Sequence, residues 1–283
     1  MTRFFKYHAL GNDYLVIDSN RNSWVPSVES IRRICHRHYG IGSDGILYGP
    51  ELASDGSFGL RIFNPDGSEA EKSGNGIRIF ARYLVEAGYA TARSFIIATP
   101  GDRVQVEALS EHADLFQVDM GTVSFRSERI PVRGESREVI DEPVTVGGRS
   151  FRMTCLTIGN PHCVIPLAEI SPALALEVGP VIENLPLFPN RINLQLLQVL
   201  DRNRIRIEIW ERGAGYTLAS GSSSCAAASA AFRLGLVDPK ITVQMPGGNI
   251  TVAIQPDGRI LMTGPVTAVA IGEFAADLQQ ELG

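Results

Sequence analysis

The chain has 283 residues, which exceeds the usual size of a single domain, so two domains are expected. Hydrophobic residues make up 44% and charged residues 20%, and the net charge of −5 is that of an ordinary globular protein. This mild acidity, without runs of Lys or Arg, argues against a nucleic-acid partner. No apolar run approaches the roughly 20 residues of a membrane helix, and the first residues lack the pattern of a secretion signal.

Cysteine usage points to a reducing compartment. The four cysteines are scattered and lack the paired spacing of a metal site: Cys35, Cys155, Cys163 and Cys225. We therefore expect a cytoplasmic protein with buried, reduced thiols, no bound metal and no contact with a membrane.

In the first half of the chain, a strand is predicted over 59–63, where apolar and polar residues alternate. A polar turn over 64–72 leads from it into a helix that begins with Ser73 and Gly74. The helix is predicted from apolar residues that recur at helical spacing before Gly88, a natural stop. These residues are Ile77, Phe80, Ala81 and Leu84.

The second half of the chain repeats this order. Residues 204–210, RIRIEIW, alternate and predict a strand, and a polar turn over 211–219 follows. The helix that begins with Ser220 and Gly221 is almost entirely Ala and Ser, so we interpret it as a buried central helix. The last strand, around 264–271, is expected to cross back to the first domain.

Sliding the sequence along itself by about 147 positions brings the two halves into register. Gly11–Ile17 then lies over Gly159–Ile165, and the two Ser-Gly pairs at the predicted helix starts coincide. Asn64 and Glu211 stand nine residues before these pairs, each at the end of an apolar stretch. Three anchors at nearly one offset indicate a duplicated domain.

The predicted fold class is α+β, with two similar domains related by an approximate twofold axis. In each domain a mixed or antiparallel sheet would curl around the central helix. The N-terminal domain is expected over 1–120, completed by 266–283, and the C-terminal domain over 121–265.

The paired helix starts suggest a binding site for an anion. The first turn of a helix carries N–H groups without internal partners, and glycine lets a carboxylate or phosphate approach them. Taken singly, Ser73 and Ser220 are also ordinary N-caps. Two of them facing one ligand suit the inversion of a carbon acid, because two proton carriers on opposite faces perform it without a cofactor.

Six segments resemble, in chain order, the signature segments of the diaminopimelate epimerase family: ALGNDYLVID, YGIGSDGIL, FNPDGSEAEKSGNGIRIFARYL, TIGNPHCVI, RINLQLLQV and ERGAGYTLASGSSSCAAA. The resemblance covers essentially the whole chain. It implies an epimerase of two related domains with a cleft between them, which uses no cofactor, neither pyridoxal phosphate nor metal. The implied partner is a small amino acid, with LL- to meso-diaminopimelate as the best match, and homodimers are common in the family.

The resemblance also implies roles for individual residues. Ser73 and Ser220 occupy the two acid/base positions, and Glu211 would hold the amino group at the reacting carbon. Further substrate contacts would come from Asn12 and, at the distal amino-acid end, from Asn64, Asn160, Asn193 and Arg212. The reacting carboxylate would meet the backbone N–H groups of Gly74, Asn75, Gly221 and Ser222. Three more residues would lie nearby: His162, Asp44 and Tyr216. Taken singly, the asparagines are also typical turn residues, and Arg212 is also a typical surface charge.

Both acid/base positions depart from the family, which carries cysteine where this chain has Ser73 and Ser220. A cysteine titrates near 8.5 and a serine roughly five units higher, so forming the base costs about 7 kcal/mol more. A helix dipole, worth about 0.3–1 kcal/mol, does not recover that difference. Epimerisation of the thiolate kind is therefore expected to be severely slowed or lost.

Three interpretations of the serines remain open. They are a laboratory Cys→Ser pair that traps substrate, a natural paralogue that racemises or dehydrates another amino acid, and a binding protein without turnover. The paralogue is favoured by further departures from the family pattern at Lys72, Ile79, Tyr216 and Ser223. Lys72 is also a candidate base, although adjacent residues at a helix start usually point apart. An isomerase of a carboxylate without an amino group, similar to the phenazine-pathway relatives, is disfavoured by Glu211.

Overall fold

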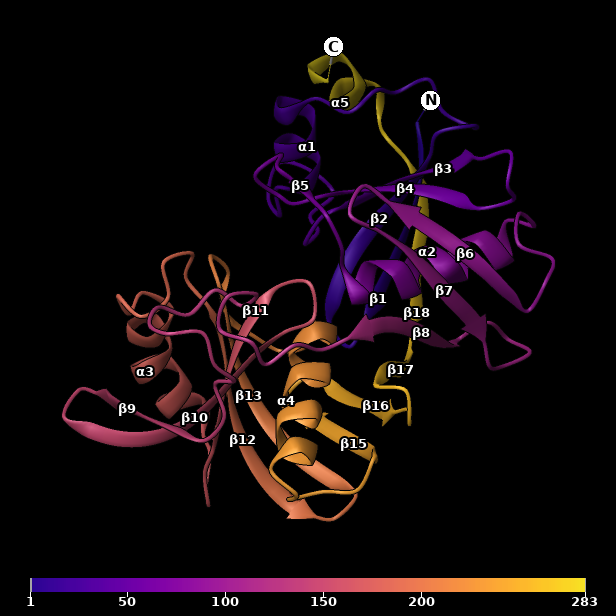
Figure 1. Cartoon of the computed structure of the whole chain (residues 1–283). Coiled ribbons are helices and arrows are strands. Elements are labelled where there is room, and N and C mark those ends of the chain that lie inside the picture. Colours follow the sequence, from indigo (N-terminus) through magenta and orange to yellow (C-terminus); the bar gives the residue numbers. More distant parts are fainter. Residues whose placement is uncertain (1, 283) are drawn as a thin grey trace. The chain divides into compact units, whose positions relative to one another are not determined.

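The structure is a computed structural model, and it describes residues 2–282. The chain forms two compact units, Met1–Val118 together with Gly264–Gly283, and Asp119–Thr263. The expected boundaries at 120 and 266 lie two residues from these. Figure 1 shows the C-terminal strand, in yellow, running beside the first strands of the chain.

The first unit is a sheet with three helices. Its strands are β1 (Arg3–Ala9), β2 (Asn12–Asp18), β3 (Ile46–Leu52), β4 (Phe58–Phe63), β5 (Glu69–Ala70), β6 (Ser94–Thr99), β7 (Asp102–Ala108), β8 (Leu115–Thr122) and β18 (Thr267–Glu273). Its helices are α1 (Val28–Cys35), α2 (Gly74–Glu86) and α5 (Ala276–Glu281). The strand order is β18–β1–β2–β3–β4–β6–β7–β8, and β5 pairs with β4.

The second unit has the same plan. Its strands are β9 (Glu142–Val146), β10 (Arg149–Thr157), β11 (Pro161–Pro166), β12 (Asn193–Asp201), β13 (Arg204–Glu211), β14 (Gly215–Thr217), β15 (Lys240–Met245), β16 (Gly248–Ile254) and β17 (Arg259–Pro265). Its helices are α3 (Pro172–Glu183) and α4 (Gly221–Arg233). The strand order is β9–β10–β11–β12–β13–β15–β16–β17, and β14 pairs with β13.

Corresponding strands pair in the same sense in both units. β2–β3 and β11–β12 are parallel, as are β4–β6 and β13–β15, while the remaining neighbours are antiparallel. Even the outer strands match, because β18 lies antiparallel beside β1 and β9 antiparallel beside β10. The duplication predicted from the sequence is therefore confirmed in the topology of the sheets.

The helices α2 and α4 occupy the same place in this topology and begin and end alike. Ser73 and Ser220 are their N-caps, with extended backbones and side chains that accept an N–H from the first turn. Each helix has 13 residues and is followed by a glycine with positive φ, Gly88 at 79° and Gly235 at 72°. These glycines adopt the left-handed conformation that commonly ends a helix.

The helix α4 is buried almost all round. Its residues Ser223–Ala231 are buried, and it packs against β10, β11, β12, β13, β15 and β16. Figure 1 shows the same helix, in orange, among these strands. The small Ala and Ser side chains make this close approach possible, so the interpretation as a buried central helix is confirmed. The helix α2 likewise packs against β1, β2, β3 and β7.

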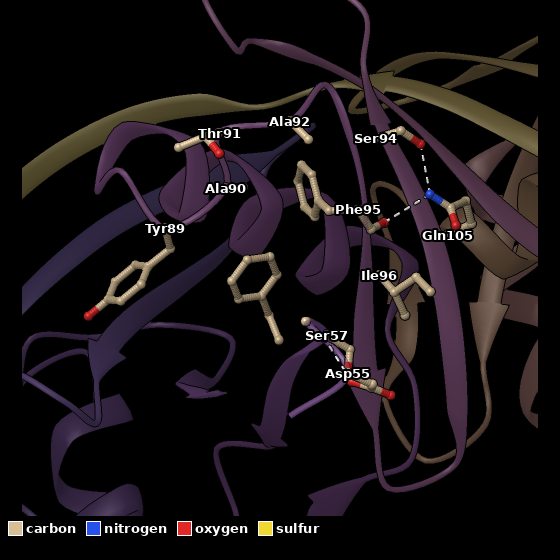
Figure 2. A pocket seen from close by; sticks show the side chains of 12 residues that line it. Asp55, Ser57, Tyr89, Ala90, Thr91, Ala92, Ser94, Phe95, Ile96 and Gln105 are labelled. Carbon is tan, nitrogen blue, oxygen red and sulfur yellow. Dashed lines mark hydrogen bonds between the residues drawn. The ribbon is translucent and has the colours of Figure 1, made fainter. Parts of the chain in front are cut away.

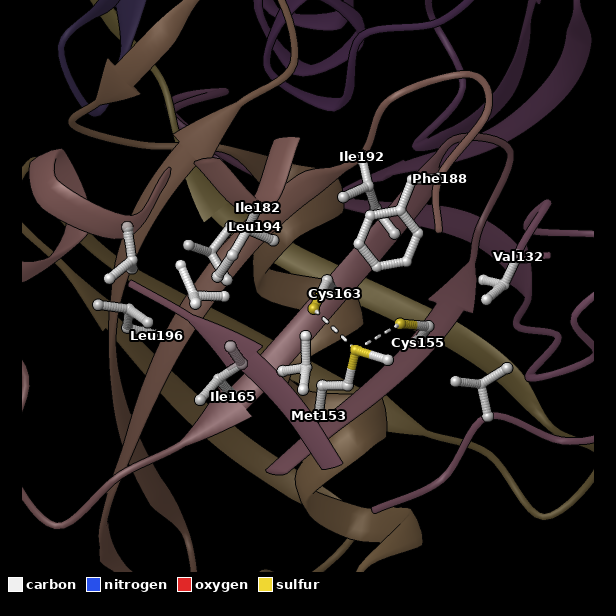
Figure 3. Close-up of a cluster of buried hydrophobic side chains, with 14 of the residues drawn as sticks. Val132, Met153, Cys155, Cys163, Ile165, Ile182, Phe188, Ile192, Leu194 and Leu196 are labelled. Carbon is white, nitrogen blue, oxygen red and sulfur yellow. Dashed lines mark hydrogen bonds between the residues drawn. The ribbon is translucent and has the colours of Figure 1, made fainter. Parts of the chain in front are cut away.

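Each unit has its own hydrophobic core. In the second unit, shown in Figure 3, the Sγ atoms of Cys155 and Cys163 lie 3.8 and 3.9 Å from the sulfur of Met153. In the first unit the core gathers around Leu15 and Ile17 of β2. All four cysteines are buried and outside any disulfide bond, as expected. Within residues 2–282, no helix is long and apolar enough to cross a membrane.

Candidate active site

The start of α2 holds the Ser73 side chain in a defined position. Its Oγ accepts the N–H of Gly76 at 3.0 Å, which is the capping bond of the helix. A side chain at Gly76 would have its Cβ 3.3 Å from this same oxygen, so glycine leaves room for the cap. The hydroxyl of Tyr14, from β2, lies 3.4 Å from Ser73 Oγ. Ser73 is therefore both a cap and the neighbour of a buried phenol.

A chain of side-chain hydrogen bonds runs behind this helix start. The buried guanidinium of Arg78 donates to Asn75 Oδ1 at 2.9 Å, and Asn75 Nδ2 donates to Asn12 Oδ1 at 3.0 Å. Asn12 Nδ2 then donates to Asp44 Oδ2 at 3.0 Å. A cation can only donate and a carboxylate can only accept, so the two charged ends set the direction of the whole chain. Both amides are therefore held in one orientation.

The acceptor end of this chain is fixed by charge. Arg37 bridges Asp44 and Asp13, at 2.6 and 2.8 Å, and Lys6 lies 2.9 Å from Asp13. Burial alone would raise the pKa of Asp13, but the hydrogen bonds from Arg37 and Lys6 hold it below its ordinary value. The Asp13 and Asp44 carboxylates therefore anchor the loop before β3 to β2.

The start of α4 repeats the capping arrangement with different neighbours. Ser220 is buried, and its Oγ accepts the N–H of Ser223 at 3.4 Å. The Ser223 hydroxyl in turn accepts from Gln195 Nε2 of β12 at 3.0 Å. At the equivalent place in the first unit, a Cβ on Gly76 would meet Leu47 of β3 at 3.0 Å. Where the first unit has Gly76 close to an apolar side chain, the second unit has a hydrogen-bonded pair, which accommodates the unusual Ser223.

Glu211 ends β13 beside this helix start. Burial raises the pKa of its carboxyl group above the ordinary value of 4.5, and a hydrogen bond with the Ser220 side chain opposes that rise. A carboxylate with a raised pKa is a stronger base than a solvated one. The hydroxyl of Ser220 therefore lies against a group that is able to accept its proton.

The next residue, Arg212, is positioned through its backbone. Its N–H donates to Asn193 Oδ1 at 2.8 Å, while Asn193 Nδ2 donates to the Pro161 carbonyl at 2.8 Å. The Arg212 guanidinium donates to the Asn190 carbonyl at 2.9 Å. Among the described residues, no carboxylate is paired with it. A guanidinium bound only to a carbonyl retains donors for a carboxylate ligand.

Asn160 and His162 form the remaining part of the second cluster. The Nε2–H of His162 donates to Asn160 Oδ1 at 2.9 Å, and Asn160 Nδ2 donates to Ser222 Oγ at 3.3 Å. The bond from Asn160 to Ser222 joins positions equivalent to Asn12 and Asn75, but its direction is reversed, because Asn75 donates to Asn12 in the first unit. Burial lowers the pKa of His162 to about 3, although Gln195 alongside it opposes the change. The imidazole is therefore neutral at neutral pH.

Three further candidate residues make ordinary side-chain contacts outside these hydrogen-bond chains. Asn64 donates through Nδ2 to Ser68 Oγ at 3.0 Å, within a turn that also contains Asp66. The Lys72 ammonium pairs with Asp102 at 2.9 Å, and an ammonium held this way is not a free base. The Tyr216 hydroxyl donates to Glu208 at 2.6 Å, and burial together with that carboxylate raises the pKa of Tyr216 to about 12.

The predicted residues thus gather into two clusters, one in each unit. The first surrounds the start of α2 and includes Asn12, Asp44, Ser73, Gly74 and Asn75. The second surrounds the start of α4 and includes Asn160, His162, Asn193, Glu211, Arg212, Ser220, Gly221 and Ser222. Each cluster offers helix N–H groups for an anion and one hydroxyl with a titratable neighbour, which is the equipment for proton transfer beside a carboxylate.

Three functional candidates escaped the sequence interpretation: Tyr14, Arg78 and Gln195. Tyr14 and Arg78 both lie in segments that resemble the family, but only the pairing of β2 with its neighbours and the packing of α2 bring them to Ser73 and Asn75. Gln195 faces α4 from β12. One signal in the sequence could have pointed to Tyr14: it aligns with His162, so both halves of the repeat carry a titratable side chain at this position.

A pocket of about 410 Å³ lies elsewhere in the first unit, where Phe58, Tyr89 and Phe95 contribute to its lining (Figure 2). Two of its polar groups satisfy each other, since Gln105 Nε2 donates to Ser94 Oγ at 2.7 Å. None of the predicted site residues lines this pocket, so it takes no part in the arrangement described above.

Comparisons with known proteins agree with the resemblance noted in the sequence. A family model described as diaminopimelate epimerase matches residues 4–126 and 154–269. The chain is 54% identical to diaminopimelate epimerase 2 of Nostoc sp. over 98% of this chain and 96% of that protein. It is 40% identical to diaminopimelate epimerase of Moorella thermoacetica over 97% and 99% of the two chains.

Solved structures share the fold at low sequence identity. A hydroxyproline epimerase from Agrobacterium vitis matches with a TM-score of 0.72 and 14% identity, over 98% of this chain and 93% of the other. A phenazine biosynthesis protein from Bacillus anthracis matches with a TM-score of 0.68 and 15% identity, over 97% and 99%. Both likenesses establish the mixed α/β fold of this group of proteins.

The buried His162 makes stability depend on pH. Because its folded-state pKa is about 3 and its unfolded value near 6.5, the unfolded state binds the proton more tightly between these values. The free energy of unfolding should therefore fall as the pH drops from 6.5 to 4, by up to about 3 kcal/mol from this residue. Urea titrations at several pH values measure it, with His162→Gln as the comparison. Parallel curves for the two proteins would show that the histidine is not held neutral.

Proposed function

Because the chain belongs to the diaminopimelate epimerase family, we propose that it is an isomerase that inverts the α-carbon of diaminopimelate between the LL and meso forms. The proposed mechanism moves protons only and uses no cofactor. One side chain removes the α-proton from one face, and a second returns a proton to the opposite face. The proposed location is the cytoplasm, in keeping with four buried cysteines that form no disulfide bond.

The observation that carries this proposal is the pair of capped helix starts at equivalent positions of a duplicated chain. Ser73 and Ser220 would stand in the acid/base positions, and the N–H groups of Gly74, Asn75, Gly221 and Ser222 would bind the reacting carboxylate. Removing an α-proton spreads negative charge onto that carboxylate. Helix N–H groups aimed at it would stabilise this charge as it develops.

A serine needs a neighbour to act as a base, and Glu211 is the neighbour we propose for Ser220. Its raised pKa and its hydrogen bond with Ser220 support this role. The Ser220 oxygen would take the α-proton while its own proton passes to the Glu211 carboxylate. A carboxylate has two oxygens and about four acceptor positions, so Glu211 is also able to hold the substrate amino group.

The distal amino-acid end of the substrate would be held in the second unit by Asn160, Asn193 and Arg212, with Asn64 as a further contact. The guanidinium of Arg212 donates to the Asn190 carbonyl and retains further donors, which supports a carboxylate ligand at this place. Arg212 takes its position from Asn193, which receives its backbone N–H. We therefore propose that Asn193 acts mainly by placing Arg212.

The strongest alternative is a binding protein of the same fold without turnover. The serines favour it, because a bare hydroxyl is a far weaker acid and base than a thiol. A paralogue acting on another amino acid is the second alternative. Measured turnover distinguishes the binding protein from the proposed epimerase, and the identity of the substrate distinguishes the paralogue. One set of variants tests both alternatives.

Incubation of the purified protein with LL-diaminopimelate should produce the meso form, measured by chromatography of the two isomers. The double variant Ser73→Cys/Ser220→Cys should be faster by at least about tenfold, because a thiol titrates several units below a hydroxyl. A silent parent with an active double variant would identify a binding protein or a trapped epimerase. Two silent proteins would mean that the substrate is another amino acid.

The acid limb of kcat/KM against pH should report Glu211. The carboxylate is the active form, so activity should rise with pH through the raised pKa, at a value above 4.5. Steady-state rates between pH 4 and 8 measure it, on a buffer series of constant ionic strength. An acid limb below 4.5 would contradict a role for this carboxyl group as the base.

We also propose that the protein forms a homodimer through β18. Apart from Gly272, the residues of this strand are exposed, with Val269 at 53% and Ile271 at 63%. Among the described residues, its one pairing partner is β1. An unprotected apolar edge strand invites pairing, and an antiparallel strand is able to pair with its own copy across a twofold axis.

Ile271→Lys should turn the dimer into a monomer, because a charge on the edge strand prevents strand pairing. Sedimentation velocity over a range of protein concentrations measures the change. Leu176→Lys, at an exposed position of α3, is the matched control and should leave the mass unchanged. A monomeric parent, or equal masses for parent and Ile271→Lys, would remove this interface.

A further inference from the structure

We propose that Tyr14 is a proton relay that acts through Ser73, as the group that gives a proton to the Ser73 oxygen and takes one from it. The inference rests on the proposed function and assigns the partner that the first serine would otherwise lack. The second serine has a carboxylate for this purpose, whereas the first has a phenol. The two halves of the reaction would then use different chemistry at equivalent positions of the repeat.

The position of Tyr14 is set by close packing. It lies on β2, it is 6% exposed, and its hydroxyl is 3.4 Å from Ser73 Oγ. A Cβ on Gly45 would stand 2.7 Å from the nearest ring carbon of Tyr14, so the absent side chain at position 45 makes room for the ring. Any residue other than glycine at this place would push the phenol out of position.

The cap occupies one acceptor position of the Ser73 oxygen. Ser73 Oγ already accepts the N–H of Gly76, and this bond favours the oxygen in its negatively charged form. The serine O–H is then the donor to the substrate carbon, and the phenol O–H is the donor to the serine oxygen. The order of the atoms is phenol, serine oxygen and α-carbon.

The proposed step balances as follows. The Ser73 proton forms the new bond to the α-carbanion, and the Tyr14 proton passes to the Ser73 oxygen as the Ser73 O–H bond breaks. Tyr14 is left as a phenolate and Ser73 is unchanged. On the opposite face, the Ser220 oxygen has taken the α-proton, and Glu211 has gained the hydroxyl proton that Ser220 gave up. In the reverse direction the Tyr14 phenolate takes the Ser73 proton, and Ser73 takes the α-proton.

The acidity of a phenol makes this relay effective. A tyrosine titrates near 10, about 1.5 units above a cysteine, so giving up the proton is about 30-fold less favourable than from a thiol. For a serine alone the corresponding factor is roughly 10⁵, from a difference of about five units. Tyr14 would therefore recover most of the proton-donating ability that is lost when the thiol is replaced by a serine hydroxyl.

At rest, the two halves would differ in protonation. The relay requires a Glu211 carboxylate that is ready to accept and a neutral Tyr14 phenol that is ready to donate. In the second unit the position equivalent to Tyr14 is His162, whose Nε2 is bonded to Asn160. The phenol relay is thus specific to the first unit, and a variant of Tyr14 should affect one half-reaction only.

The test uses Tyr14→Phe in heavy water, with each diaminopimelate isomer supplied separately and the α-proton followed by NMR. One isomer has its α-proton facing Ser220, and it should exchange with deuterium within about threefold of the parent rate but without inversion. The other isomer should lose exchange and inversion together, by about 10²–10⁴-fold. Retained exchange in the first isomer also proves that the variant is folded.

Two controls separate catalysis from packing. Tyr48→Phe removes another phenol of the first unit, which donates to the Trp24 carbonyl, and should leave both isomers at parent rates. In a Ser73→Ala background, Tyr14→Phe should add nothing, because both residues serve one relay.

Equal losses for the two isomers in Tyr14→Phe, or rates equal to the parent, would overturn the role of Tyr14 and leave the proposed epimerase intact. A parent protein that exchanges neither isomer would overturn both proposals.

Discussion

A helix start must satisfy its own first N–H groups, and in this protein two serines do so at the two most important places of the fold. Ser73 accepts from Gly76, and Ser220 accepts from Ser223. A hydroxyl that accepts a capping N–H is still able to exchange its own proton with a neighbouring group, and that group decides what the serine is able to do. That group is a phenol in the first unit and a carboxylate in the second.

The duplication supplies matched scaffolds, and the differences between them supply the chemistry. The strand order, the pairing senses and the 13-residue helices agree, and equivalent positions are hydrogen-bonded in both units, Asn75 to Asn12 and Asn160 to Ser222. The titratable neighbours of the two serines differ, as do the residues whose N–H groups the serines accept. An inversion needs a donor on one face and an acceptor on the other, so two identical halves would be less suitable than two that have diverged.

The sequence predicted the fold where the relevant signals are local. Strands over 59–63 and 204–210 follow from alternation, and the helices after Ser73 and Ser220 follow from caps, apolar spacing and terminal glycines. The contact between Tyr14 and Ser73 could not be predicted in this way, because it joins residues 59 positions apart and depends on how α2 packs on β2. The same holds for the bond between Asn12 and Asn75.

The most direct test of the account follows the α-proton of the parent protein in heavy water, starting from LL-diaminopimelate. We predict that the meso product carries deuterium at the inverted carbon, since the group that returns the proton differs from the group that removes it. Substrate that binds but keeps its proton and its configuration after prolonged incubation would contradict the claim that these serines, with Tyr14 and Glu211, transfer protons.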